Sequence, residues 1–271
     1  NPPMKNDHKR GLRGETSGWT ASASRSNTRF LYSVVPGDLD GYGYAFTFTI
    51  KDLPPTPGDW EKLRRKMIER LRRMGFTRLH WLTEWQRRGV PHLHGCVYFD
   101  EPLTTEQFHG LSKHWVAAAC EFNASIQAQN VKEITSALGW LEYLSKHAAR
   151  GVYHYQRNGK PKEWDKTGRM WGKSGTWSTK LTEAEIPISH FHKLRRLCRN
   201  WRIADARKPK LVPVDGMHGL KVSQVNSKRI RSARTCLQHR DKNLCTVLGV
   251  SEWINEKVAM QMLDFIKQNS D

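Results

Sequence analysis

Two short apolar stretches joined by a five-residue link constrain the fold of this chain more than any other feature. Residues 78–86 (RLHWLTEWQ) and 92–99 (HLHGCVYF) each have the length of a β-strand, and residues 87–91 connect them. Parallel strands need a crossover of about a dozen residues or more, whereas antiparallel strands can be joined by a short turn. The sequence therefore predicts a β-hairpin over residues 78–99.

Periodic patterns before and after this hairpin predict further strands and helices, so the hairpin would be part of a larger sheet. In residues 43–51, Tyr44, Phe46, Phe48 and Ile50 alternate with other residues, as on one face of a half-buried strand. We expect strands over 29–35, 43–51 and 129–134, and helices over 59–74, with Asp59 as N-cap, 105–122 and 135–149. The order β-α-β-β-α-β-α predicts an α+β fold, a central antiparallel β-sheet with helices on one face.

The remaining segments suggest three regions along the chain. Residues 1–28 are polar and lack periodicity, which predicts a flexible basic arm. Residues 29–185 would form the main domain. Residues 186–271 would form a basic, mainly helical C-terminal region, with one amphipathic helix over 190–206 and a small helical segment over 235–271.

The charge of the chain indicates a polyanionic partner. There are 45 Lys and Arg against 26 Asp and Glu, a net charge of +19. Such a field attracts nucleic acid, although some basic proteins bind other acidic surfaces instead. The chain also has 11 Trp, and aromatic rings stack on unpaired bases, so single strands are favoured.

Other features narrow the class of protein. The five Cys are scattered and lack CxxC spacing, which is typical of reduced thiols rather than of disulfides or a zinc site. No apolar run approaches the ~20 residues that span a bilayer, and the first residues are too polar for a signal peptide. No Walker loop is present, so no fused helicase is expected. We expect a soluble, cytoplasmic protein in a bacterial cell.

The segment Pro91-His92-Leu93-His94-Gly95 carries the strongest chemical signal. On a strand, His92 and His94 share one face, and two imidazoles so placed can bind one divalent metal. Glu84 would join them if the turn pairs it with His92 or His94, and the sequence leaves that register open. Two His and one carboxylate leave metal positions open for a phosphate oxygen and water. An incidental histidine pair is the alternative.

A nucleophile is suggested by the segment that follows the last predicted strand. Tyr143 and Lys146 lie three residues apart, and on a helix they share a face. A tyrosine oxygen can attack a phosphodiester and conserve the bond energy in a phosphotyrosine, and an ammonium nearby would balance phosphate charge. An ordinary amphipathic helix would show the same pattern.

In combination, these segments resemble the HUH endonucleases, and among them the rolling-circle replication initiators of phages and plasmids. YAFTFT (44–49) looks like the first motif of that family, and TEWQRRGVPHLHG (83–95) looks like its metal motif. YLSK (143–146) looks like its tyrosine motif, and GRMWGKSGTW (168–177) is similar to a stretch that often follows.

The resemblance implies a role for each matching residue. His92, His94 and Glu84 would bind Mg²⁺ or Mn²⁺. Tyr143 would nick single-stranded DNA, leaving a 5′-phosphotyrosine and a 3′-OH primer, and Lys146 would position the phosphate. The substrate implied is single-stranded or hairpin DNA at a replication origin, and a host helicase and polymerase would be partners.

This sequence departs from the pattern of many phage enzymes at one position. They carry a second tyrosine one helical turn after the first, where this chain has His147. Tyr153 and Tyr155 lie nearby in sequence and are alternatives for a second nucleophile. An HUH transposase or relaxase remains an alternative, although relaxases usually carry three histidines, and so does a non-catalytic single-strand-binding protein.

Basic and aromatic residues also suggest where DNA binds. Arg169, Trp171 and Lys173 lie in a segment that interleaves cations, aromatic rings and glycines, which suits unpaired bases. Arg87 and Arg88, in the hairpin link, are further candidates. The basic residues between 190 and 234 suggest a duplex-binding surface or a solvated linker.

Overall fold

The structure is a computed structural model, which describes residues 18–137, 139–141, 144, 154–181, 184–208, 211–214, 217–222, 230–231, 234, 254 and 256–269. Backbone contacts divide the chain into two units. The first comprises residues 1–23, 40–135 and 152–176, and the second comprises residues 24–39, 136–151 and 177–271.

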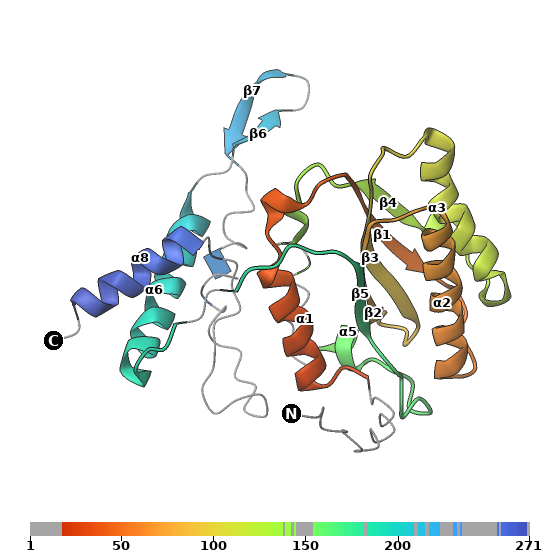
Figure 1. Ribbon diagram of the computed structural model, residues 1–271, viewed down its shortest axis with the longest axis horizontal. Helices are drawn as coiled ribbons and strands as arrows, with labels where there is room; N and C mark the ends of the chain where they lie inside the picture. Colours follow the sequence, from red (N-terminus) through yellow and green to blue (C-terminus); the bar gives the residue numbers. More distant parts are fainter. Residues whose placement is uncertain are drawn as a thin grey trace, which may run out of the picture. The chain divides into compact units, whose positions relative to one another are not determined.

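The first unit is built on a five-stranded antiparallel sheet in the order β4-β1-β3-β2-β5 (Figure 1). Its strands are β1 (Tyr42–Thr49), β2 (Arg78–Trp85), β3 (Pro91–Phe99), β4 (Asn130–Glu133) and β5 (Trp171–Gly175). Its helices are α2 (Pro57–Arg73), α3 (Thr105–Ala118), α5 (Tyr155–Asn158) and the short 3-10 turns η2 (Cys120–Phe122) and η3 (Ile126–Ala128). The predicted α+β fold is confirmed.

The predicted hairpin is the centre of this sheet. Strands β2 and β3 pair with Glu84 opposite His92, which is one of the two registers that the sequence left open. The Gln86 N–H donates to the Val90 carbonyl, and Gly89 adopts a positive φ of 79°. That left-handed conformation favours glycine, so the turn itself holds the register.

Helices α2 and α3 cover one face of the sheet (Figure 1). Both begin at a threonine whose hydroxyl accepts a backbone N–H, Thr56 for α2 and Thr104 for α3. Thr104 and Gln107 complete a capping box. The prediction that Asp59 is the N-cap of α2 is wrong, because Pro57 starts the helix two residues earlier and Asp59 lies in its first turn.

Aromatic rings form the core between the sheet and these helices. Trp115 of α3 stacks on Phe48 of β1, with 5.3 Å between ring centroids, and meets the edge of Trp60 of α2 at 5.9 Å. Residues that alternate with Phe48 on β1, such as Thr47, belong to the opposite face of the sheet. His92 and His94 share that opposite face, because Thr47 pairs with His94.

The second unit contains α6 (Ile188–Arg207), α8 (Glu256–Gln268), η1 (Pro36–Asp38) and a two-stranded sheet of β6 (Leu211–Val214) and β7 (Met217–Val222). The helix expected over 190–206 is therefore confirmed, whereas β6 and β7 were not expected. Of the helix predicted over 135–149, the described residues 137, 139–141 and 144 are helical.

The edge strand predicted over 29–35 is wrong. Residues Ala21–Ser33 form helix α1, which also includes the end of the expected N-terminal arm. Ser24, Asn27, Leu31 and Val34 are buried at helical spacing. Two of these residues are polar, so the apolar pattern alone was too short to reveal the helix. Within the described residues, no helix is both long and apolar enough to cross a membrane.

Candidate metal centre

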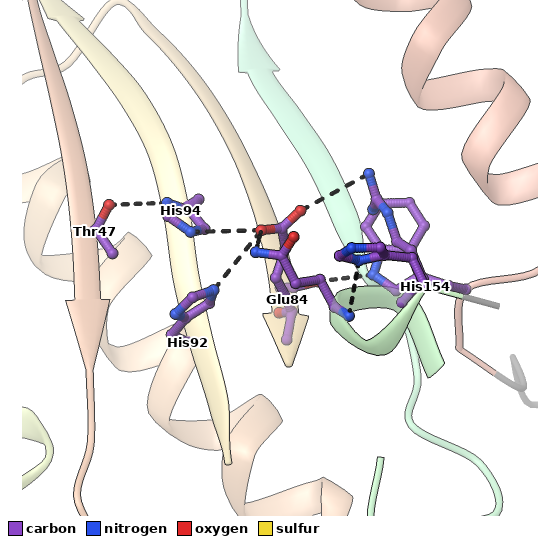
Figure 2. Close-up of polar contacts among 9 residues, drawn as sticks. Thr47, Glu84, His92, His94 and His154 are labelled. Atoms are coloured by element: carbon purple, nitrogen blue, oxygen red, sulfur yellow. Dashed lines mark hydrogen bonds and ion pairs between the residues drawn. The ribbon is translucent and has the colours of Figure 1, made fainter. Parts of the chain in front are cut away.

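Glu84, His92 and His94 converge on one point of the central hairpin (Figure 2). The Glu84 Oε2 atom lies 3.8 Å from His92 Nε2 and 3.6 Å from His94 Nε2. The two imidazole rings are 4.3 Å apart and nearly perpendicular. One potential ligand atom from each residue lies within 4.8 Å of the others, which is the spacing of donors around a single cation.

A hydrogen bond from the next strand orients His94. The Thr47 hydroxyl lies 2.8 Å from His94 Nδ1, on the side of the ring away from Glu84 (Figure 2). When Nδ1 donates this hydrogen bond, the lone pair of Nε2 faces the carboxylate. A partner on the outer nitrogen is how metal-binding histidines are usually held.

The donors of the cluster fit a divalent cation. Within the described residues, the buried His92 Nε2 atom has no hydrogen-bond partner, although it faces the cluster. A buried polar atom without a partner is costly, and a metal ion would satisfy it. Two imidazole nitrogens and one carboxylate oxygen would leave coordination positions open. The Glu84 side chain is fully buried, whereas 12% of the His92 side chain and 9% of the His94 side chain remain exposed.

Residues of α5, which the sequence did not suggest, contact the same carboxylate. Gln156 Nε2 donates to Glu84 Oε2 at 3.1 Å, and Arg157 lies 4.0 Å from Glu84 Oε1. His154 caps α5 by accepting the Gln156 N–H. The sequence offered no signal for Gln156 or Arg157, because they follow Glu84 by more than seventy residues in a segment that reads as basic surface.

Three known proteins resemble this chain over nearly its whole length. The replication-associated protein G2P of Pseudomonas phage Pf3 is 42% identical over 263 residues, covering 95% of this chain and 88% of the relative. Two putative replication proteins of Xylella fastidiosa, from strains 9a5c and Temecula1, are each 39% identical and cover 95% and 93% of this chain, and 89% and 93% of their own lengths. The chain belongs to this family of replication proteins. No family model and no solved structure matches it.

The structure places the predicted DNA contacts of this replication protein at two sites. Trp171 and Lys173 lie on the edge strand β5 and pair with Leu82 and His80, so they share the sheet face of Glu84. Lys173 is exposed, Trp171 is half-buried, and Arg169 is exposed just before β5. Trp171 and Lys173 therefore lie on the sheet face that also carries Glu84, His92 and His94, and their contact with DNA remains a prediction.

The two hairpin arginines differ in their surroundings. The Arg88 guanidinium donates to the backbone carbonyls of Ile50 and Lys51, so it ties the turn to the end of β1. Arg87 lies over the ring of Tyr155, 5.4 Å from its centroid. Arg88 therefore has a structural role that the sequence did not predict, and Arg87 remains the better candidate for DNA.

The predicted nucleophile lies outside the described residues. Tyr143 and Lys146 both fall in such positions, as does Tyr153. Tyr155 is described at the start of α5, and 39% of it is exposed. Their roles remain predictions.

The buried His80 of β2, which pairs with Lys173 of the neighbouring strand β5, is expected to make the stability of the replication protein depend on pH. Burial, with a smaller contribution from Lys173, lowers the pKa of His80 from 6.5 to about 3. The unfolded chain therefore takes up a proton below pH 6.5 that the folded protein does not accept until about pH 3. Stability is present in full above pH 6.5 and is lost as the pH falls through this window.

We expect acid to destabilise the protein less when His80 is replaced. Between pH 7 and pH 5, the wild type should lose about 2 kcal/mol more unfolding free energy than His80→Leu, because the slope is about 1.4 kcal/mol per pH unit. Urea unfolding at the two pH values measures this difference. Equal losses in both proteins would contradict the assignment, whatever the absolute stability of the variant.

Proposed function

We propose that this replication protein is a rolling-circle initiator of the HUH type, an endonuclease and strand transferase that nicks single-stranded DNA with a tyrosine. The cluster of Glu84, His92 and His94 carries this proposal, since it joins a histidine pair and a carboxylate at the centre of the sheet. The names of the relatives, all replication proteins, support the biological role.

In this proposal Glu84, His92 and His94 hold Mg²⁺ or Mn²⁺. When bound, such an ion polarises the scissile phosphate as a Lewis acid. The Tyr143 hydroxyl attacks the phosphorus and gives up its proton. The phosphorus–O3′ bond breaks, the O3′ atom gains a proton, and a 5′-phosphotyrosine remains. Lys146 would balance the charge that builds up on the phosphate.

The free 3′-OH would prime a host polymerase, and a host helicase would open the duplex ahead of it in the cytoplasm. Single-stranded or hairpin DNA at an origin would lie along Arg87, Arg169, Trp171 and Lys173. We propose residues 29–185 as the endonuclease domain and 186–271 as a basic C-terminal region that binds phosphates of the flanking duplex.

The test is formation of a covalent adduct on a denaturing gel. The protein is incubated with a labelled single-stranded library that includes the origin region of its own replicon. We expect a protein-linked DNA band with Mn²⁺, none with EDTA, and none with His92→Ala in either condition. His109→Ala is the matched control, because His109 lies on α3 away from the cluster, and it should form the band normally.

Two results would contradict the proposal. Tight DNA binding without any adduct would indicate a non-catalytic single-strand-binding protein. An adduct that forms equally in EDTA and with His92→Ala would remove the metal cluster from the reaction.

A further inference from the structure

The buried guanidinium of Arg157 lies next to Glu84, beside the carboxylate oxygen that does not face the two histidines. Arg157 and Glu84 both have fully buried side chains, and the Arg157 guanidinium is 4.0 Å from Glu84 Oε1. The other carboxylate oxygen, Oε2, faces the two histidines. Glu84 therefore lies between a permanent positive charge on one side and the potential metal position on the other.

The surroundings of Arg157 hold that charge in place. Its guanidinium carbon lies 3.6 Å from the ring of Trp19, and the Trp19 indole donates to the Thr83 carbonyl at 2.8 Å. Thr83 directly precedes Glu84 on β2. The Trp19 ring and strand β2 thus fix Arg157 relative to the carboxylate, and arginine favours positions over aromatic faces.

Charge balance explains why such a cation is needed. Without a metal and without Arg157, the Glu84 carboxylate would be a buried negative charge, which is strongly unfavourable without a partner. The Arg157 guanidinium balances this charge when no metal is bound. With a divalent ion bound, Arg157 and the ion repel each other across the carboxylate.

We infer that Arg157 balances the charge of Glu84 when no metal is bound. Arg157 thereby keeps the site assembled without metal, and it weakens the binding of the metal ion. Gln156 orients the Glu84 oxygen that binds the metal ion. The inference rests on the proposed metal site. Arg157 and Gln156 are positioning residues, and they act on metal affinity in opposite directions.

The substitutions Arg157→Met and Gln156→Met separate the two roles. Arg157→Met removes a positive charge near the cation, so the Kd for Mn²⁺ should fall about tenfold or more. Gln156→Met removes the hydrogen bond to Oε2, so the Kd should rise about ten- to a hundredfold. Arg157→Lys keeps the charge and should stay within about threefold of the wild type.

Binding is measured with Mn²⁺ alone, from the electron paramagnetic resonance of the free ion, and melting temperatures are compared in EDTA and in saturating Mn²⁺. Because metal binding and stability are linked, Arg157→Met should lower the melting temperature more in EDTA than in Mn²⁺. A role confined to packing on Trp19 would lower both equally and leave the Kd unchanged.

Arg64→Met is the matched control. Arg64 is also a buried arginine over a tryptophan, 4.2 Å from the Trp81 ring centroid, and it donates to the Arg169 carbonyl. Trp81 belongs to the helix-covered face of the sheet, so this variant should lose stability equally with and without Mn²⁺.

The outcomes distinguish the inference from the proposed function. If the wild type binds Mn²⁺ but Arg157→Met binds it with equal or lower affinity, the counter-charge is overturned and the metal site stands. A shift in Arg157→Lys as large as that in Arg157→Met would also overturn it. If neither the wild type nor any variant binds Mn²⁺, the metal site of the proposed function is refuted, and so is the role of Arg157 as its counter-charge.

Discussion

Tyr143→Phe is expected to abolish the covalent DNA adduct, with a loss of at least about a thousandfold in the rate of its formation. The substitution removes one oxygen atom, the one that would bond to phosphorus, and leaves a ring of the same shape. Binding of the same DNA, measured by fluorescence anisotropy, should change little because the charged contacts remain. Quantifying the adduct band over time gives the rate.

Tyr155→Phe is the comparison that makes this result specific. Tyr155 lies on α5, one residue from Gln156, which bonds to Glu84. If Tyr143 is the nucleophile, Tyr155→Phe should still form the adduct. The reverse pattern would move the nucleophile to α5, and loss of the band in both would indicate that two tyrosines act in one reaction cycle.

The second large effect is expected in the core. Trp115→Ala should reduce the unfolding free energy by about 3–5 kcal/mol, because it leaves a cavity beside Phe48 and Trp60. It also leaves the Thr49 carbonyl without the hydrogen bond that the indole donates at 2.8 Å. A loss of this size is a large part of the stability of an ordinary domain.

Urea unfolding followed by circular dichroism measures this loss. Leu53→Ala is the control, since 39% of Leu53 is exposed and its truncation should cost less than about 0.5 kcal/mol. Similar losses in the two variants would mean that the aromatic cluster does not hold the helices on the sheet.

The hairpin and the clustering of Glu84, His92 and His94 could be predicted because their signals are local. His92 and His94 share a strand face by the period of the strand alone, and a five-residue link leaves few registers. The choice between them came from the turn, where Gly89 has a positive φ and Gln86 bonds to Val90. The residues of β1 to β4 and of the two covering helices were also indicated by periodicity, whereas strand β5 and the order of the strands in the sheet were not predicted.

Contacts between distant segments could not be predicted. Thr47 read only as the polar position between Phe46 and Phe48, and its hydrogen bond to His94 depends on how β1 pairs with β3. From the sequence alone, Arg157 could not be distinguished from the many other basic residues of the chain. Its burial against Trp19 depends on the path of segments more than a hundred residues apart.

Local strand propensity also led to the wrong prediction for residues 29–35. Phe30 and Val34 favour a strand by residue type, yet Phe30 lies in α1 and Val34 directly follows it. The burial of Asn27 continues their spacing in the helical period, and a buried asparagine carries no hydrophobic signal.

Glu84, His92 and His94 all belong to one hairpin, so the candidate metal centre can begin to form before the rest of the sheet is in place. Glu84 and His94 are separated by so few residues that closing the loop between them costs little entropy, and hairpins form within about 1–10 μs. Thr47 and Arg157, which orient His94 and Glu84, reach these residues only when β1 and α5 pack against the hairpin. A partly unfolded chain can therefore keep these three side chains together while losing their alignment, and the proposed nicking activity should disappear before the hairpin's own amide protons begin to exchange rapidly.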